Sequence, residues 1–233
     1  MQLAVIVPFR DRHSHLERFV PYMKEYLKGI PNEIVVIEQT SDKLFNRGKL
    51  MNVGFALTQA HYYAFHDVDQ LPHDVDYRYP DTPVHLACRM EHNHKQLPFK
   101  ETMGGVALLN REDVLKINGF DNDYWGWGWE DVDLYMRCTM NGLEVKRYDE
   151  GWYESLPHDR SHIFQENKEY HRWCEKNSAR FHALMSANGF EYSGPFIHND
   201  SMSEAYPSGI SDLEFTLLGA EERQDYTLYT VSI

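Results

Sequence analysis

The chain has 233 residues and a formal net charge of −13, from 23 Lys and Arg against 36 Asp and Glu. A hydrophobic content of 42% with 14% aromatic residues excludes a disordered chain and allows one domain with a sizeable core. The acidic balance argues against a nucleic-acid-binding protein, and three cysteines are too few for a disulfide framework, which favours a reducing compartment.

The N-terminal part of the chain alternates predicted strands and helices. Residues 3–9 form a continuous apolar run, which is typical of a strand buried on both faces. The patterns that follow predict a helix over 16–27, a strand over 33–37, a helix over 50–57 and a strand over 61–66. This alternation indicates an α/β fold built on a parallel sheet with right-handed crossovers.

The remaining elements are predicted from shorter patterns. They are strands over 84–88, 105–109 and 143–148, short helices over 111–118 and 131–140, a helix within 166–184, a loop over 187–211, and strands over 212–218 and 226–233. No shift in composition marks a linker, so we expect a single domain over 1–233. No apolar run approaches the roughly 18 residues of a membrane span.

Two carboxylates, Asp67 and Asp69, directly follow the third predicted strand. Ligands of an open parallel sheet bind at the carboxyl ends of its strands. A carboxylate pair there can hold Mg²⁺ or Mn²⁺ against a diphosphate, because these ions prefer oxygen ligands and share their sites with substrate phosphates. By itself such a pair is also typical of a turn, and only its position favours a metal site.

A second segment contains three tryptophans separated by single glycines, followed by Glu130, Asp131 and Asp133. Glycine at this spacing suits neither the interior of a helix nor that of a strand. Indole rings can lie against the apolar faces of sugars, so the segment indicates a carbohydrate site. The alternative is an aromatic core cluster ahead of a helix whose dipole favours the acids. That alternative explains the carboxylates but not the glycine spacing.

Arginines and aromatic residues occur where a nucleotide would approach the sheet. Arg10 and Arg12 follow the first strand, and Phe45 and Arg47 open the second helix. Arginine binds phosphate in a bidentate manner and Phe can face a base, although each arginine taken alone is more typical of an ordinary surface residue.

The histidines give one further candidate for a metal ligand. His158 and His162 lie four residues apart, which permits shared ligation in a helix, but Pro157 favours a loop, so at most one of them is expected to bind metal. The zinc-protease, P-loop, dinucleotide-binding and Ser or Cys nucleophile signatures are all absent from the sequence.

Taken together, these motifs resemble the β-1,4-galactosyltransferase family (glycosyltransferase family 7). The matching sequences are P-F-R-D-R at 8–12, F-N-R-G-K-L-M-N-V-G-F at 45–55, H-D-V-D-Q-L-P at 66–72, G-G-V-A-L-L at 104–109 and N-G-F-D-N-D-Y-W-G-W-G-W-E-D at 118–131, followed by a His. The two closing strands also resemble the family, whereas 164–207 has no convincing counterpart.

The resemblance implies a GT-A fold, with a central, mostly parallel sheet flanked by helices and a small C-terminal β extension. It implies an inverting, metal-dependent transfer of galactose or N-acetylgalactosamine from UDP-galactose or UDP-N-acetylgalactosamine to a saccharide or glycoconjugate acceptor, in β linkage and expected to be β-1,4. Residues 1–110 would form the half that binds the nucleotide sugar, and 111–233 the half that binds the acceptor.

Residue roles are carried over by position. The implied donor-binding residues are Pro8, Phe9, Arg10, Arg12, Phe45, Arg47, Asp67, Val68, Thr102, Gly104, Gly105 and Trp127. The implied acceptor-binding residues are Tyr124, Trp127, Glu130 and Asp131, with Asp131 as the catalytic base. Asp69 and His158 match the metal ligands, for Mn²⁺ or Mg²⁺.

Three positions depart from the family pattern. Thr102 stands where members often have Tyr, which would leave space beside C2 of the donor sugar and favour acceptance of N-acetylgalactosamine. The second C-terminal metal ligand has no clear match, and Ser155 occupies one candidate position. Trp129 replaces a smaller residue after W-G-W-G.

Two other functions are weighed against transfer: a catalytically silent carbohydrate-binding protein, and a metal-dependent phosphoesterase using Asp67, Asp69 and His158. Release of UDP that a saccharide acceptor stimulates distinguishes the transferase from both. The transferase function depends on Asp69 and Asp131 lying around one cleft.

The expected location depends on the extent of the chain. Because a strand begins directly after Met1, no signal peptide or membrane stem is recognisable, and we expect a cytoplasmic protein if the chain is complete. If it is trimmed from a longer protein, a Golgi-lumenal location is expected by the resemblance.

Overall fold

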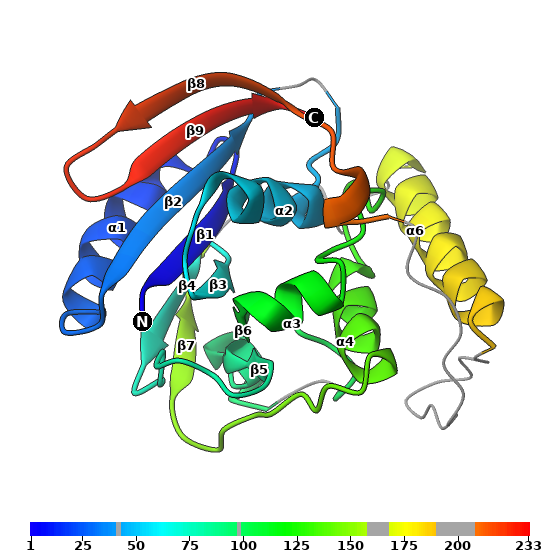
Figure 1. The fold of residues 1–233 in the computed structure, drawn as a ribbon, viewed down its shortest axis with the longest axis horizontal. Helices are drawn as coiled ribbons and strands as arrows, with labels where there is room; N and C mark the ends of the chain where they lie inside the picture. Colours follow the sequence, from blue (N-terminus) through cyan, green and yellow to red (C-terminus); the bar gives the residue numbers. More distant parts are fainter. Residues whose placement is uncertain (41–42, 97–98, 158–167, 190–207) are drawn as a thin grey trace.

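The structure is a computed structural model and describes residues 1–40, 43–96, 99–157, 168–189 and 208–233. A sheet of seven strands in the order β5-β6-β3-β1-β2-β9-β8 forms its centre (Figure 1). The strands are β1 (Leu3–Phe9), β2 (Asn32–Gln39), β3 (Tyr62–His66), β5 (Val84–His85), β6 (Val106–Asn110), β8 (Thr216–Glu222) and β9 (Thr227–Ser232).

The middle of the sheet is parallel, as the alternating pattern predicts. Strand β1 pairs in parallel with β2 and with β3, and β2 pairs in parallel with β9. The outer pairs β3–β6, β5–β6 and β8–β9 are antiparallel. The C-terminal hairpin β8–β9 therefore extends the central sheet beyond β2.

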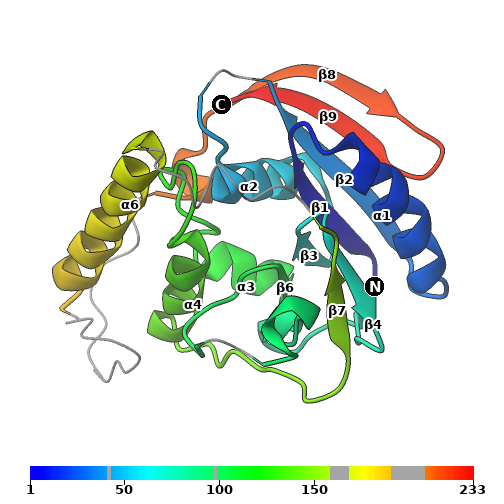
Figure 2. The same ribbon diagram turned by 180° about the vertical axis from the view of Figure 1, so that it is seen from behind.

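Helices on both faces explain why β1 is apolar throughout. Helix α1 (His13–Tyr26) packs on Leu3, Val5 and Val7, and helix α2 (Arg47–Leu57) packs on the other face with Ala4 and Ile6. Figures 1 and 2 show the two helices on opposite sides of the sheet. A strand covered on both faces has no side free for polar residues.

Further helices, a second small sheet and 3₁₀ turns accompany the central sheet. They are α3 (Arg111–Lys116), α4 (Glu130–Met140), α6 (Lys168–Ala187), the small sheet of β4 (Gln70–His73) and β7 (Trp152–Ser155), and the 3₁₀ turns η1 (Leu86–Cys88), η2 (Glu91–Asn93) and η3 (Ile210–Asp212). None of the helices among the described residues is long and apolar enough to cross a membrane.

Three predicted strands differ from the structure. The strand predicted over 212–218 begins only at Thr216 and runs to Glu222, because Ile210–Asp212 form the turn η3. The strand predicted over 84–88 ends at His85, because β6 offers only two partners there and the chain turns into η1, whose Ala87 side chain packs close to Gly105. The strand predicted over 143–148 is absent: Lys146 makes a single bridge to Val84, and the short β5 has no room for a longer ladder. Strands β4 and β7 were not predicted, since each has only four residues.

Candidate active site

A glycine turn joins the two stretches of sequence that carry the predicted chemistry. The N–H of Asp67, at the end of β3, donates to the carbonyl of Gly105 (2.9 Å). On the other side of the turn, a Cβ added to Gly104 would lie 2.6 Å from Oδ2 of Asp131. Only glycine permits this close approach, so the turn places Asp67 and Asp131 on either side of one site.

Arg47 contacts both the Asp67 carboxylate and the glycine turn. Its Nε donates to Oδ1 of Asp67 (2.6 Å), and its Nη2 lies 3.5 Å from the Gly105 carbonyl. Asn46 forms the N-cap of α2 by accepting from the N–H of Lys49 (2.9 Å), and this cap fixes where Arg47 leaves the helix.

Thr102 contacts the predicted catalytic base. Its hydroxyl donates to Oδ2 of Asp131 (2.9 Å), and the N–H of Met103 donates to the Asp131 carbonyl (3.1 Å). Thr102 is buried, so this hydroxyl orients the carboxylate from inside the protein. The other oxygen, Oδ1, accepts from the N–H of Val132 (2.9 Å) in the first turn of α4.

The carboxylates influence one another across the site. Burial, followed by the charge of Asp131, raises the pKa of Glu130 to about 7, against the opposing effect of the Arg47 guanidinium. Burial also raises the pKa of Asp67, which the charges of Asp69 and Asp131 push in the same direction and Arg47 opposes. Carboxylates from β3 and α4 therefore share one electrostatic environment that favours a cation.

Asp69 lies beside the small sheet. Its carbonyl accepts from the N–H of Leu156 (2.7 Å), and its Oδ1 lies 3.4 Å from the side-chain nitrogen of Gln70. Ser155 donates to Gln70 Oε1 (3.2 Å) and lies 2.7 Å from Nδ1 of His92, a neighbour that sequence reasoning missed. The predicted ligand His158 lies outside the described residues, as does His162.

The turn after β1 presents Arg10 to the same edge of the sheet. The guanidinium of Arg10 lies 5.3 Å from the centre of the Phe45 ring and donates to the Lys43 carbonyl (2.8 Å). Phe9 is buried and contacts His13 edge to face, and Pro8 and Val68 are likewise buried. Arg12 forms the N-cap position of α1.

The segment 125–129, here called the tryptophan loop, connects to α4. Trp127 is 60% exposed, with its ring centre 6.2 Å from that of Tyr170 in α6. Gly126 and Gly128 have φ of +81° and +94°. Glycine adopts such positive φ angles more readily than other residues, which explains why glycines alternate with the tryptophans. Tyr124, which the resemblance assigns to the acceptor, is buried in the structure, and its hydroxyl lies 3.5 Å from Oδ1 of Asp133.

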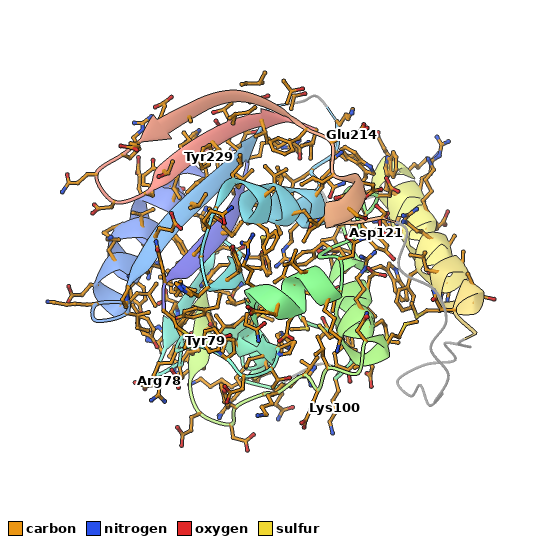
Figure 3. The ribbon with its side chains drawn as sticks, in the orientation of Figure 1. Arg78, Tyr79, Lys100, Asp121, Glu214 and Tyr229 are labelled. Carbon is orange, nitrogen blue, oxygen red and sulfur yellow. The ribbon has the colours of Figure 1, made fainter. Side chains whose placement is uncertain are left out.

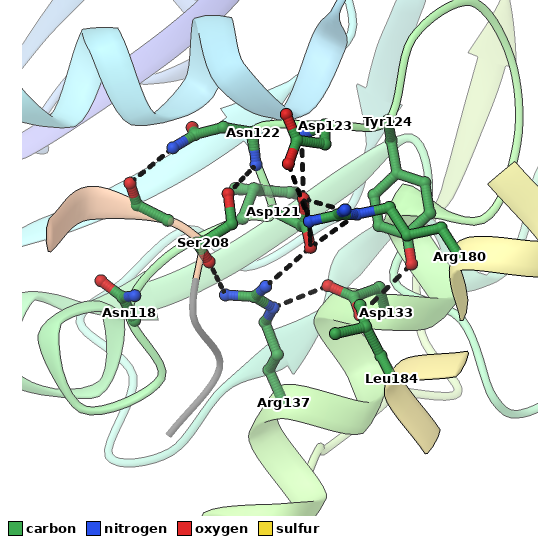
Figure 4. Close-up of polar contacts among 12 residues, drawn as sticks. Asn118, Asp121, Asn122, Asp123, Tyr124, Asp133, Arg137, Arg180, Leu184 and Ser208 are labelled. Atoms are coloured by element: carbon green, nitrogen blue, oxygen red, sulfur yellow. Dashed lines mark hydrogen bonds and ion pairs between the residues drawn. The ribbon is translucent and has the colours of Figure 1, made fainter. Parts of the chain in front are cut away.

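Behind the loop lies a buried ion network that the sequence did not reveal (Figure 4). Fully buried Arg137 donates to Asp133 (2.6 Å) and Asp121 (3.3 Å), and Arg180 of α6 reaches Asp121 (2.8 Å) and Asp123 (2.9 Å). Figure 3 shows Asp121 on the side of the molecule facing α6. The one available signal was the i, i+4 spacing of Asp133 and Arg137.

A doubly covered, mostly parallel sheet with carboxylates at its strand ends defines the GT-A class of folds. Family models agree: residues 1–80 match the N-terminal region of glycosyl transferase group 7, and 84–159 match a model described as the N-terminal domain of galactosyltransferase. The chain belongs to the β-1,4-galactosyltransferase family, glycosyltransferase family 7, as its motifs predicted.

Individual relatives give the extent of the similarity. The chain is 35% identical to mouse β-1,4-galactosyltransferase 2, over 99% of this chain and 59% of that protein. It is 42% identical to human β-1,4-galactosyltransferase 6, over 67% of this chain and 44% of that protein. The chain thus spans about three fifths of the length of the first of these relatives.

Solved structures are similar over the whole chain. The catalytic domain of Drosophila β1,4-galactosyltransferase 7 in complex with xylobiose has a TM-score of 0.78 at 29% identity, covering 100% of this chain and 94% of that one. A mutant of that enzyme, in complex with manganese, UDP-Gal and xylobiose, has a TM-score of 0.78 at 28% identity, with the same coverage. The GT-A fold expected from the sequence is confirmed.

Proposed function

We propose that this protein is a metal-dependent galactosyltransferase, which moves galactose from UDP-galactose to a saccharide acceptor in β-1,4 linkage with inversion. One observation carries the proposal: the Gly104–Gly105 turn contacts both Asp67 and Asp131, so that a strand-end carboxylate and a helix-start carboxylate flank the same site. The Drosophila relative bound to manganese, UDP-Gal and xylobiose supports the choice of metal, donor and acceptor class.

Binding of the donor is assigned to the sheet edge, with residues 1–110 as the donor half and 111–233 as the acceptor half. Arg10 and Phe45 would face the nucleotide, since a guanidinium pairs with phosphate and a ring can stack on a base. Arg47 stands between Asp67 and the glycine turn, where it would hold the carboxylate that approaches the donor sugar.

The residues present fit Mn²⁺ or Mg²⁺. Among the described residues no group of three His, Cys, Asp or Glu side chains could hold a metal, but these ions are commonly held by one or two carboxylates together with substrate phosphates. Asp69 would supply that carboxylate and His158 an imidazole, and the acidic environment around Asp67 suits a cation. When bound, the metal would neutralise the charge of the departing diphosphate.

Asp131 is assigned as the base. Its carboxylate would take the proton of the acceptor hydroxyl as that oxygen attacks the anomeric carbon from the face opposite UDP, which inverts the configuration. The Thr102 hydroxyl and the Val132 N–H each hold one of the two carboxylate oxygens, so the base is oriented before substrate binds. Glu130 would accept a hydrogen bond from the acceptor sugar, and Trp127 would lie against a sugar face and exclude water.

The donor sugar is set in part by Thr102. Because this position carries no aromatic ring, we propose that UDP-N-acetylgalactosamine is accepted as well as UDP-galactose. Comparing kcat/KM for the two donors, in the wild type and in Thr102→Tyr, tests this: the variant loses the hydroxyl that orients Asp131 and should be slower with both donors, but the loss should be larger for the acetylated one. Strong exclusion of UDP-N-acetylgalactosamine by the wild type would contradict it.

The function is tested by measuring UDP release with Mn²⁺, with and without saccharide acceptors that include xylosides and N-acetylglucosamine. Release that the acceptor stimulates, together with a new β-1,4-linked product by NMR, is the expected result. Release that is indifferent to acceptor would indicate hydrolysis, and no release of UDP would indicate a non-catalytic carbohydrate-binding protein. Either result overturns the proposal.

A further inference from the structure

Helix α6 packs against both α4 and the tryptophan loop. Phe181 and Met185 of α6 share a buried cluster with Val132 and Met136 of α4. The two helices lie side by side in Figures 1 and 2. This helix belongs to the part of the sequence for which motif reasoning found no purpose.

One side chain of α6 binds the main chain of the loop. The amide nitrogen of Asn177 donates to the carbonyls of Trp125 (3.0 Å), Trp127 (3.2 Å) and Gly128 (3.2 Å). Asn177 is 2% exposed, so its hydrogen bonds are shielded from water. An amide has two N–H donors, and here three carbonyls share them.

The loop requires such a partner because its backbone forms no regular structure. The positive φ of Gly126 and Gly128 turns successive peptide groups away from helix or strand geometry, and their carbonyls then have no ladder to join. The side-chain amide of Asn177 gives three carbonyls of the loop a hydrogen-bond donor. The thiol of Cys174, one turn earlier in α6, lies 3.6 Å from the Trp127 carbonyl and adds a weaker contact.

A second contact fixes the junction between the loop and α4. Trp129 has φ of +78°, which is strained for a bulky residue, and its ring packs on Phe181 (4.8 Å) and His182 (5.4 Å) of α6. Trp129 immediately precedes Glu130 and Asp131. The packing of Trp129 against α6 therefore also fixes the start of α4, and with it the positions of the Glu130 and Asp131 carboxylates.

We propose that Asn177 is a positioning residue: by binding the loop carbonyls it sets the place of Trp127 and of the start of α4 relative to the bound sugars. Trp127 is 60% exposed, so burial of its own side chain does not hold it, and its position depends on its main chain. The inference rests on the proposed function, because it concerns the same site, but it makes a separate statement about α6.

The test compares Asn177→Ala with Asn188→Ala. Asn188 is a second buried asparagine of the same helical segment, and its amide donates only within the segment, to the Leu184 carbonyl (2.8 Å). Both variants lose a buried amide donor, but only the first loses contact with the loop. Alanine favours helix, which protects α6 itself. Should Asn177→Ala fail to fold, Asn177→Ser, whose hydroxyl is too short to reach all three carbonyls, replaces it.

Two readouts separate positioning from loss of stability. In the activity assay, Asn177→Ala should raise the acceptor KM and the ratio of UDP hydrolysed to sugar transferred by about tenfold, because a displaced loop admits water and misplaces the acceptor. Asn188→Ala should leave both unchanged. A loss of folded protein would lower hydrolysis and transfer together, without changing their ratio, and that outcome overturns the proposal.

Hydrogen exchange gives a readout that does not depend on activity. Amides of 125–130 should exchange faster in Asn177→Ala than in the wild type or in Asn188→Ala, while those of β1 and β3 stay protected. Unchanged exchange over 125–130 would overturn the inference. If the wild type itself shows no transfer stimulated by acceptor, the proposed function fails, and the exchange experiment still decides the role of Asn177.

Discussion

At the scale of single residues, the site is organised around Asp131. Its two oxygens accept hydrogen bonds from Thr102 and from the N–H of Val132, and Gly104 leaves the space for it. Such fixed partners hold a carboxylate in one rotamer, which is the requirement for a base that must meet a hydroxyl in a defined direction.

Asp131→Asn keeps the size of the side chain and removes its basicity. We expect transfer to fall by about 10²–10⁴-fold, the range for loss of a general base, with the affinity for UDP and Mn²⁺ unchanged. Steady-state kinetics and calorimetric titration of UDP measure the two effects. Retained turnover would require a different base, and weakened UDP binding would indicate a structural role.

The pH dependence of stability follows from Glu130. Its pKa in the folded protein is about 7, above its ordinary value of 4.5, so the folded state holds the proton more tightly than the unfolded state. The stability that this provides is fully present below pH 4.5 and is lost as the pH rises through 7. Glu130→Gln should therefore gain up to about 3 kcal/mol relative to the wild type between pH 5 and pH 8.

Urea unfolding at pH 5 and pH 8, without metal or donor, measures this difference. The variant should also use the acceptor poorly, since a neutral amide replaces the carboxylate that we propose accepts a hydrogen bond from the sugar. A stability difference that does not change with pH would show that Glu130 does not titrate in this range.

At the scale of elements, the buried ion network joins three segments. Asp121 precedes the tryptophan loop, Arg137 lies in α4 and Arg180 in α6, and the Asp121 carboxylate lies 3.3 Å from the Arg137 guanidinium and 2.8 Å from that of Arg180. A buried charge is costly unless it is paired, so displacing any one of the three segments would leave an unpaired buried charge in the others.

Asp121→Asn should lower the free energy of unfolding by about 3–5 kcal/mol, because it leaves two arginines without their shared buried carboxylate. The matched control is Asp123→Asn: this carboxylate binds the same Arg180 (2.9 Å), but its side chain is 56% exposed, and exposed pairs contribute about 0–1 kcal/mol. Denaturant unfolding of both variants tests the difference. Equal effects would mean that burial is not what makes the network important.

At the scale of the whole molecule, the sheet brings the donor edge and the acceptor elements together. The residues proposed to bind the donor follow β1 and β3 and begin α2, while those proposed to bind the acceptor come from the loop ahead of α4 and from the start of α4. The antiparallel β6 runs back beside β3 and carries the glycine turn at its start, which is why 104–105 and 67 meet.

Removal of the metal should weaken UDP binding and so reduce the stability that UDP adds to the fold. With Mn²⁺, UDP at 100 times its Kd should stabilise the fold by about 2.7 kcal/mol, and EDTA should abolish most of that gain. Asp69→Asn should behave like EDTA, whereas Asp81→Asn, an exposed acid away from the site, should behave like the wild type. Thermal shift measurements test this, and a UDP effect indifferent to both EDTA and Asp69→Asn would contradict the metal assignment.

Much of the fold was predictable because its strongest signals are local. The apolar run of β1 and the helical spacing of Leu16, Phe19, Val20 and Met23 report burial directly, and both elements formed as predicted. Residues 143–148 have a mixed apolar and charged pattern that also permits a strand, but they form none, because a ladder there depends on the length of its partner β5.

By itself, the sequence determined the family, the parallel α/β core and the residue types of the site, since periodicity and motif spacing are properties of short segments. Only the tertiary structure decided that Thr102 orients Asp131, that Tyr124 is buried, and that Asn177 binds the tryptophan loop. These contacts join segments that are distant in the chain. They depend on how the folded helices, strands and loops pack together, which no local sequence pattern encodes.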